Sequence, residues 1–284
     1  NGILVGNDHD ADPSKWGDHT GWLVKSNIIE NFGYIGFELT NTSSSSIEDN
    51  IIHLNTPDIG AIFSSARRSE SDLTIKNNLI DGTPSTAFPV IYLYAYDLDM
   101  ANPNLDKVLI EGNTIDTVGT PFQIYIRNIG TGTITNVKIE QNKLSTLKNL
   151  TSATIDGSPN YWGSACGPAS GAVSGDVVYA PWYVDEAMTT TTDVAPVSGS
   201  FTIPTTMSML ERNAVIECAA DGTVFDFEDD TYTGGIVVTN DDLTFNLNGA
   251  IIGEGSPAFT IDAANITICL LYTSDAADEE DSVD

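Results

Sequence analysis

One short pattern of aliphatic and polar positions recurs five times in the first half of the chain. An aliphatic residue is followed by two spacers, an asparagine, one spacer and a second aliphatic residue. The asparagines, which are separated by 23, 28, 35 and 29 residues, are Asn27, Asn50, Asn78, Asn113 and Asn142. Spacings in this range are typical of solenoid repeats, so the pattern predicts a stack of similar coils.

The repeated asparagine predicts both a bend and a bond between coils. After glycine, asparagine is the residue that best tolerates a left-handed backbone, so we expect it to turn the chain sharply between two extended aliphatic positions. In a stack of coils the amides would also lie above one another, where they can hydrogen-bond in a ladder. The five asparagines are therefore predicted to have a structural role.

Strands are predicted beside the asparagines, because apolar and polar residues alternate there with a period of two. Residues 35–39, 91–95 and 124–127 show this alternation, whereas no stretch of the repeats has apolar residues at helical spacing. A single coil buries too few aliphatic side chains to be stable alone, so at least three coils must stack. The predicted fold is all-β, a right-handed parallel β-helix solenoid.

The domain organisation follows from changes in composition along the chain. The first β-helix is expected over residues 1–184, and residues 185–200 are rich in Thr, Ser and Pro, as in a linker. The alternation of residues 236–245 recurs 23 residues later in residues 259–268. This echo predicts the truncated start of a second β-helix over residues 201–268.

The last segment, residues 269–284, is expected to be a non-native tail. It resembles the in-frame translation of an adapter used in preparing sequencing libraries, and such scars are excluded from fold reasoning. On this interpretation the natural sequence stops within a strand and the chain is a fragment of a longer protein. A natural acidic tail is the alternative, since the segment carries six acidic residues and no basic residue.

The segment that closes the first β-helix, residues 160–184, carries the most specific motifs. It contains Asn-Tyr-Trp-Gly-x-x-x-Gly-Pro from residue 160 and Tyr-x-Pro-Trp from residue 179. With the asparagine coils before them, these motifs resemble the secreted or cell-surface right-handed parallel β-helix repeat proteins of the pectin-lyase-like superfamily. Trp162 and Trp182 are expected to cover the apolar end of the stack, and the alternative role is a platform for a sugar.

The balance of charge disfavours two classes of partner. The chain has 40 acidic and 11 basic residues, a net charge of −29. Binding to nucleic acid or to an anionic membrane surface needs clustered Lys and Arg, so we expect no nucleic-acid partner. No run of about 18 apolar residues is present, so no membrane insertion is expected in this fragment.

The three cysteines lack metal-site spacing and predict neither a disulfide framework nor a zinc site.

Coils longer than 23 residues carry insertions, which in solenoids form loops where function is often found. One insertion contains Arg67 and Arg68, the only adjacent basic pair, which are candidate ligand contacts. Another contains Asp97 and Asp99. Two carboxylates can divide the roles of acid and base in glycoside hydrolysis, so these aspartates are the catalytic candidates, with a solvated turn as the alternative.

Alternating carboxylates near the N-terminus suggest one cofactor, Ca²⁺. Asp8, Asp10 and Asp12 are spaced like the first ligands of a calcium loop. The segment lacks the glycine and the closing glutamate of such a loop, so a solvated acidic turn is the alternative.

A column of aromatic residues is expected on the outer face of one sheet. Where the aliphatic residues of a strand point inward, the residues between them point outward. Phe63, Tyr92 and Tyr125 then lie one coil apart, flanked by Tyr94 and Arg127. Exposed aromatic residues with polar neighbours are typical of a glycan-binding sheet, and aromatic stacking that stiffens the sheet is the alternative.

Together these features predict a non-catalytic protein of the extracellular space or the cell surface. It would bind a polysaccharide or a cell-surface glycan, or act as a rigid, adhesin-like module; the family resemblance supports polysaccharide association by analogy of fold alone. The alternative is a polysaccharide lyase or glycoside hydrolase whose active coils lie in the inserted loops or outside this fragment. The Gly-His-Gly stretch found in glycoside hydrolases of this fold is missing from the sequence.

Overall fold

The described part of the chain consists almost entirely of β-strands. The chain divides into two compact units, Asn1–Asp193 and Val194–Asp284. The boundary lies inside the polar stretch that the sequence predicts to be a linker, and each unit is described by itself. The computed structural model describes residues 2–5, 19–55, 60–66, 70–84, 88–96, 103–253 and 257–269.

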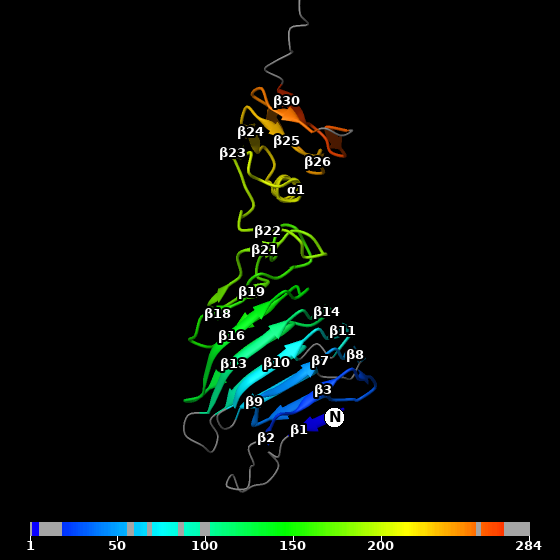
Figure 1. Cartoon of the computed structure of the whole chain (residues 1–284), viewed down its shortest axis with the longest axis vertical. Coiled ribbons are helices and arrows are strands. Elements are labelled where there is room, and N and C mark those ends of the chain that lie inside the picture. The colour runs from blue at the N-terminus through cyan, green and yellow to red at the C-terminus, as the bar shows by residue number, and fades with distance from the viewer. Residues whose placement is uncertain are drawn as a thin grey trace, which may run out of the picture. The chain divides into compact units, whose positions relative to one another are not determined.

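The first unit is a parallel β-helix with three main sheets (Figure 1). The first sheet has, in spatial order, β1 (Ile3–Val5), β5 (Ile35–Thr40), β9 (Gly60–Ala66), β12 (Ile91–Tyr96), β15 (Ile124–Ile129), β17 (Leu147–Asn149) and β19 (Val173–Ser174). The second has β20 (Val177–Val178), β18 (Ile155–Asp156), β16 (Thr133–Glu140), β13 (Asn104–Glu111), β10 (Glu70–Lys76), β7 (Ser45–Glu48) and β3 (Leu23–Lys25). The third has β14 (Thr114–Thr117), β11 (Leu79–Gly82), β8 (Ile51–Leu54) and β4 (Ile28–Ile29).

Neighbouring strands in these sheets come from successive coils and run parallel, which confirms the predicted fold class. One coil, for example, contributes β12, β13 and β14, one strand to each sheet. Two short pairs complete the unit: β2 (His19–Thr20) with β6 (Thr42–Ser43), and the antiparallel β21 (Trp182–Tyr183) with β22 (Thr191–Thr192).

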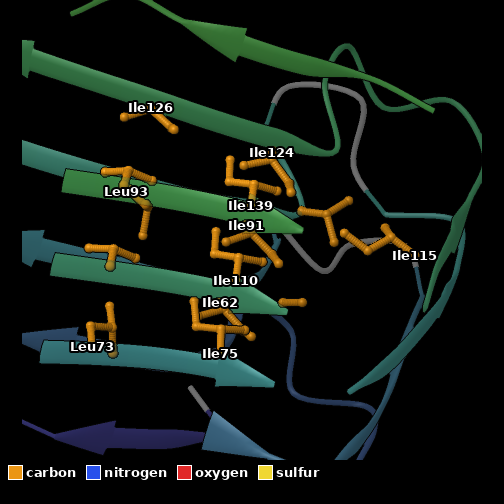
Figure 2. Packing of buried hydrophobic residues seen from close by; sticks show 14 of the residues in the cluster. Ile62, Leu73, Ile75, Ile91, Leu93, Ile110, Ile115, Ile124, Ile126 and Ile139 are labelled. Atoms are coloured by element: carbon orange, nitrogen blue, oxygen red, sulfur yellow. The ribbon is translucent and has the colours of Figure 1, made fainter. Parts of the chain in front are cut away.

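The core of the first unit consists of aliphatic columns that cross the coils. In the first sheet Ile62 pairs with Ile91 and Ile91 with Ile124, and in the second sheet Ile75 pairs with Ile110. All five are at most 1% exposed, and Figure 2 shows the two columns packed against each other. Burial of each such side chain contributes about 1.5–3 kcal/mol, so every added coil extends the same core.

Asparagine side chains hydrogen-bond from coil to coil at one corner of the β-helix. Asn50 Oδ1 accepts from both the backbone N and the Nδ2 of Asn27, each at 2.9 Å. The same two bonds recur at each later step, at 2.9–3.0 Å. The Nδ2 group also donates to a carbonyl of the preceding coil, as from Asn113 to Ile75 O at 2.9 Å. The ladder includes a sixth member, Asn160, so it reaches the closing segment.

The left-handed bend lies at the residue before each predicted asparagine, so the prediction that the asparagine itself makes the bend is wrong. The residues with positive φ are Ser26, Asp49, Asn77, Gly112 and Gln141, at 57°, 53°, 54°, 66° and 56°. The asparagine amide must point inward to reach the next coil, and all ladder members after Asn27 are buried. The preceding residue, which is Gly112 in one coil and has an exposed side chain in the other four, therefore makes the turn.

Two tryptophans extend the core into the closing segment. Trp162 and Trp182 are 4% and 3% exposed and belong to the same apolar cluster as the coils. Trp182 Nε1 donates to the carbonyl oxygen of Ala165 at 2.9 Å. Gly167 has φ +75°, and a Cβ there would lie 2.8 Å from an atom of the Trp182 ring. The motif therefore needs glycine at this position to pass closely over the indole.

The second unit is a smaller stack of parallel strands. Its largest sheet has β23 (Ser200–Ile203), β24 (Val224–Phe227), β27 (Thr244–Asn246) and β30 (Thr267–Cys269). Two further pairs are β25 (Thr231–Tyr232) with β28 (Ile251–Ile252), and β26 (Ile236–Val238) with β29 (Phe259–Ile261). The four strands of this sheet pair in register, one from each successive coil. The stack therefore begins at Ser200 and has more than the two coils that the sequence echo predicts.

The single helix of the described residues, α1 (Met209–Glu217), is missing from the sequence prediction. Ser208 caps it by accepting from the backbone N of Glu211 at 3.2 Å, the first half of a capping box. Arg212, 1% exposed, donates from Nη2 to Thr233 O at 2.9 Å, and burial lowers the pKa of its guanidinium. Because the charged residue Arg212 occupies a buried position of α1, the apolar residues of this segment do not show the helical spacing that would predict a helix.

The cysteines differ from expectation. Cys166 and Cys218 are disulfide-bonded, and Cys269 has a free thiol. Spacing along the sequence does not predict such a bond, because disulfides depend on the distance between Cβ atoms in the fold. In the part of the chain that the structure describes, no helix has the length and hydrophobicity needed to cross a membrane.

We predict that Asn113→Ala lowers the free energy of unfolding of the first unit by about 3 kcal/mol. The change leaves the buried backbone N–H of Asn78 without its acceptor and removes one hydrogen bond each from the Asn78 amide, Asn142 Oδ1 and Ile75 O, where an unpaired buried group costs roughly 1–3 kcal/mol. Asn27→Ala, at the partly exposed end of the ladder, should cost less than about 1 kcal/mol. Denaturant unfolding followed by circular dichroism measures both variants, and equal losses would contradict the role of the ladder.

Candidate functional site

The predicted aromatic column lies on the outer face of the first sheet. Phe63 of β9 pairs in register with Tyr92 of β12, which pairs with Tyr125 of β15. On either side the column continues to Glu38 of β5 and Lys148 of β17. The period of two explains this placement, because the residues on both sides of Tyr92 and Tyr125 in the strands are buried in the core.

The rings of the column contact one another from coil to coil. The ring centroids of Phe63 and Tyr92 are 5.4 Å apart, and those of Tyr92 and Tyr125 are 5.1 Å apart. The second pair is stacked with an interplanar angle of 25°. These distances fall within the range of favourable aromatic pairs, and each ring stays partly exposed.

Further rings widen the column into a surface. Along β12 the centroids of Tyr92 and Tyr94 are 5.3 Å apart, and those of Tyr94 and Tyr96 are 5.1 Å apart. Phe88 contacts Tyr92 and Phe122 contacts Tyr125, each at 6.2 Å. We call this surface the aromatic face; its members are Phe63, Phe88, Tyr92, Tyr94, Tyr96, Phe122 and Tyr125.

Phe88 and Phe122 are members that sequence analysis misses. Each residue precedes its strand by two or three positions, outside the alternating segment. Phe88 lies four residues before Tyr92, which it contacts, and Phe122 lies three residues before Tyr125. A phenylalanine shortly before the outward tyrosine in two successive coils is the signal that could have identified them.

Two cations flank the aromatic face. Arg127 is the register partner of Tyr94 and hydrogen-bonds to the side chain of Tyr92. Lys148 Nζ lies 4.7 Å from the ring centroid of Phe122 and 5.7 Å from that of Tyr125. Lysine over a ring in this range is a cation–π contact. Sequence analysis misses Lys148, because β17 has only three residues and shows little alternation.

Burial raises the pKa of the Tyr92 phenol, and the hydrogen bond with Arg127 opposes this effect in part. A tyrosine phenol is protonated at neutral pH, and the raised pKa extends this range further upward, so Tyr92 can donate a hydrogen bond to a ligand. A general base needs a pKa near the working pH. The arrangement therefore favours binding by Tyr92 over proton abstraction.

On the side of β5, the outward residues of the first sheet are polar and buried instead of aromatic and partly exposed. Glu38, which is next to Phe63 in register, is 7% exposed, and Thr40 and Ser65 on the same side of the sheet are also buried. The accessible part of the outer face therefore begins at β9. The aromatic face is bounded by buried polar residues at one end and by Lys148 at the other.

The other predicted site residues lie outside the described residues. These are the calcium candidates, the catalytic candidates and the basic pair, namely Asp8, Asp10, Asp12, Asp97, Asp99, Arg67 and Arg68. Within residues 2–5, 19–55, 60–66, 70–84, 88–96, 103–253 and 257–269, no group of three His, Cys, Asp or Glu side chains is placed to hold a metal ion.

Comparison of the chain with protein-family models, with curated proteins and with solved structures gives no match. A parallel β-helix alone does not identify a function, because one fold supports many activities. The functional argument therefore depends on the geometry of the aromatic face.

We predict that Tyr92 ionises later than an exposed tyrosine in an alkaline titration. In the unfolded chain the phenol loses its proton near the reference pKa of 10.0, while the folded chain keeps it. Its contribution to stability is complete below pH 10 and is lost as the pH rises through the folded pKa. Tyr92→Phe should therefore lose stability less steeply above pH 10.

Ultraviolet absorbance of phenolate provides the direct measurement. The late-ionising part of the titration should shrink in Tyr92→Phe, while Tyr232, whose pKa is also raised by burial, remains as an internal reference. If Tyr92→Phe instead removes a component that ionises at pH 10, the phenol is not shielded as described.

Proposed function

We propose that this chain is the β-helix module of an extracellular or cell-surface protein and that it binds glycan on the aromatic face. The observation that carries the proposal is the gathering of seven partly exposed aromatic rings on one outer surface. Full burial of such a side chain would contribute about 1.5–3 kcal/mol. Contiguous apolar surface left in water usually marks a binding site.

The chemistry of the rings favours a sugar as the ligand. Four of the seven rings are tyrosines, which combine an apolar ring with a hydroxyl group. A pyranose offers the matching groups, namely apolar C–H bonds on its faces and hydroxyls around its rim. Nucleic-acid bases also stack on aromatic side chains, but the net charge of −29 opposes a polyanion of that kind.

The β-helix presents the rings in fixed positions. Ile91 and Leu93, on the inner side of β12, are fully buried, and β12 is hydrogen-bonded to β9 and β15 along its length. A surface ordered in advance loses little conformational entropy on binding. Because parallel strands lie about 4.8 Å apart, the column offers one ring per coil to a repeating polymer.

Two further observations support the proposed location and family. Cys166 and Cys218 are each disulfide-bonded, which is typical of proteins that fold in an oxidising compartment. The closing motif with Trp162 and Trp182 resembles that of the pectin-lyase-like β-helix repeat proteins, which are secreted or displayed on cells. Both observations agree with glycan binding outside the cytoplasm.

The double variant Tyr92→Ala/Tyr125→Ala tests the proposal. Affinity electrophoresis in gels that contain xylan, galactomannan, β-glucan or pectin first identifies a polysaccharide that retards the wild-type chain. The variant should bind that polysaccharide at least tenfold more weakly, because truncating a central aromatic contact costs roughly 1–2 kcal/mol or more. A tenfold change corresponds to about 1.4 kcal/mol.

Tyr34→Ala is the matched control, since Tyr34 is 47% exposed and makes no ring contact with the aromatic face among the described residues. It should bind like the wild type. Circular dichroism establishes that each variant is folded. If the folded double variant binds as tightly as the wild type, the rings serve to stiffen the sheet and the proposal is wrong.

A further inference from the structure

The charged groups around the aromatic face narrow the class of glycan, provided that the proposed function holds. The two flanking cations are the groups that would recognise a carboxylate on the sugar. Arg127 is already hydrogen-bonded to Tyr92, and Lys148 lies over the rings of Phe122 and Tyr125. Both cations therefore already contact aromatic residues of the protein, which stabilises them without a bound carboxylate.

The surrounding charge opposes an anionic ligand. Residues 1–184 contain 20 acidic and 10 basic residues, so the first unit is itself anionic. A field of this sign repels polyanions and slows their association, most strongly at low ionic strength.

The geometry of the column indicates a linear ligand. Phe63, Tyr92 and Tyr125 stand on three successive coils, with ring centroids 5.4 Å and 5.1 Å apart. A single sugar covers one of these rings, whereas an extended chain that crosses the strands covers all three. Contact area, and with it affinity, should therefore grow with chain length until the ligand spans the column.

We infer that the aromatic face binds an uncharged, linear polysaccharide that crosses the strands from Phe63 towards Tyr125. The rings supply apolar contact, and the tyrosine hydroxyls supply hydrogen bonds to the sugar hydroxyls. Arg127 and Lys148 hold the rings in place and are not ion-pair partners of the ligand. This ligand class lacks the carboxyl group that a lyase needs beside the proton that it removes.

Isothermal titration calorimetry of the whole chain tests the inference. The ligands are cellohexaose, xylohexaose and mannohexaose, with hexagalacturonate as the charged ligand of equal length and the matching neutral disaccharides. We expect one neutral hexasaccharide to bind at least tenfold more tightly than hexagalacturonate and than its own disaccharide. Its affinity should change less than twofold between low and high salt, since no counterions are exchanged.

Phe63→Ala, at the end of the column, tests the direction of the ligand. It should weaken binding of the neutral hexasaccharide about tenfold and change binding of the disaccharide less, while Tyr34→Ala leaves both unchanged. If hexagalacturonate binds more tightly and its affinity falls with salt, the inference is wrong and the proposed function stands. If no ligand binds, neither in calorimetry nor to the polysaccharide gels, or if binding survives in Tyr92→Ala/Tyr125→Ala, the proposed function fails as well.

Discussion

The hydrogen bonds between the side-chain amides of successive ladder asparagines are the constraint on which the first unit depends. From Asn50 to Asn160, each amide oxygen accepts two hydrogen bonds from the coil before it, and each amide nitrogen donates to a backbone carbonyl of that preceding coil. These groups are buried, so any slip of one coil against the next would leave several of them unpaired at roughly 1–3 kcal/mol each. The ladder therefore fixes the register of the stack, while the aliphatic columns supply most of the burial.

The register that the asparagine ladder fixes determines which side chains lie on the outer surface of the first sheet. A shift of one residue in β12 would turn Tyr92 and Tyr94 into the core and Ile91 and Leu93 outward. With the register fixed, the outward residues of β9, β12 and β15 form the aromatic face. The aromatic rings stay partly exposed, and burial of the inward aliphatic residues of the same strands offsets this unfavourable exposure. Binding on this surface is thus a consequence of the same periodicity that builds the fold.

The sequence predicts the features that repeat and misses those that occur once. The coils, the ladder and the pairing of Phe63, Tyr92 and Tyr125 all follow from periods that can be read along the chain. The position of the bend could not be predicted from residue preference, because Asn tolerates left-handed backbone better than Ser26 or Gln141, which nevertheless make the bend in their coils. Lys148 and α1 were missed because a three-residue strand and a helix with buried Arg212 carry almost no periodic signal. Inserted segments at Arg67 and Asp97 lie outside the described residues.

Hydrogen exchange of the asparagine side-chain amides, measured by nuclear magnetic resonance, tests the central claim most directly. If the ladder fixes the stack, the Nδ2 protons of Asn78, Asn113 and Asn142 exchange only when the first unit unfolds, at the rate of its most protected backbone amides. The side-chain amide of the exposed Gln141 serves as the reference for free exchange. Ladder amides that exchange as fast as Gln141 would contradict the account.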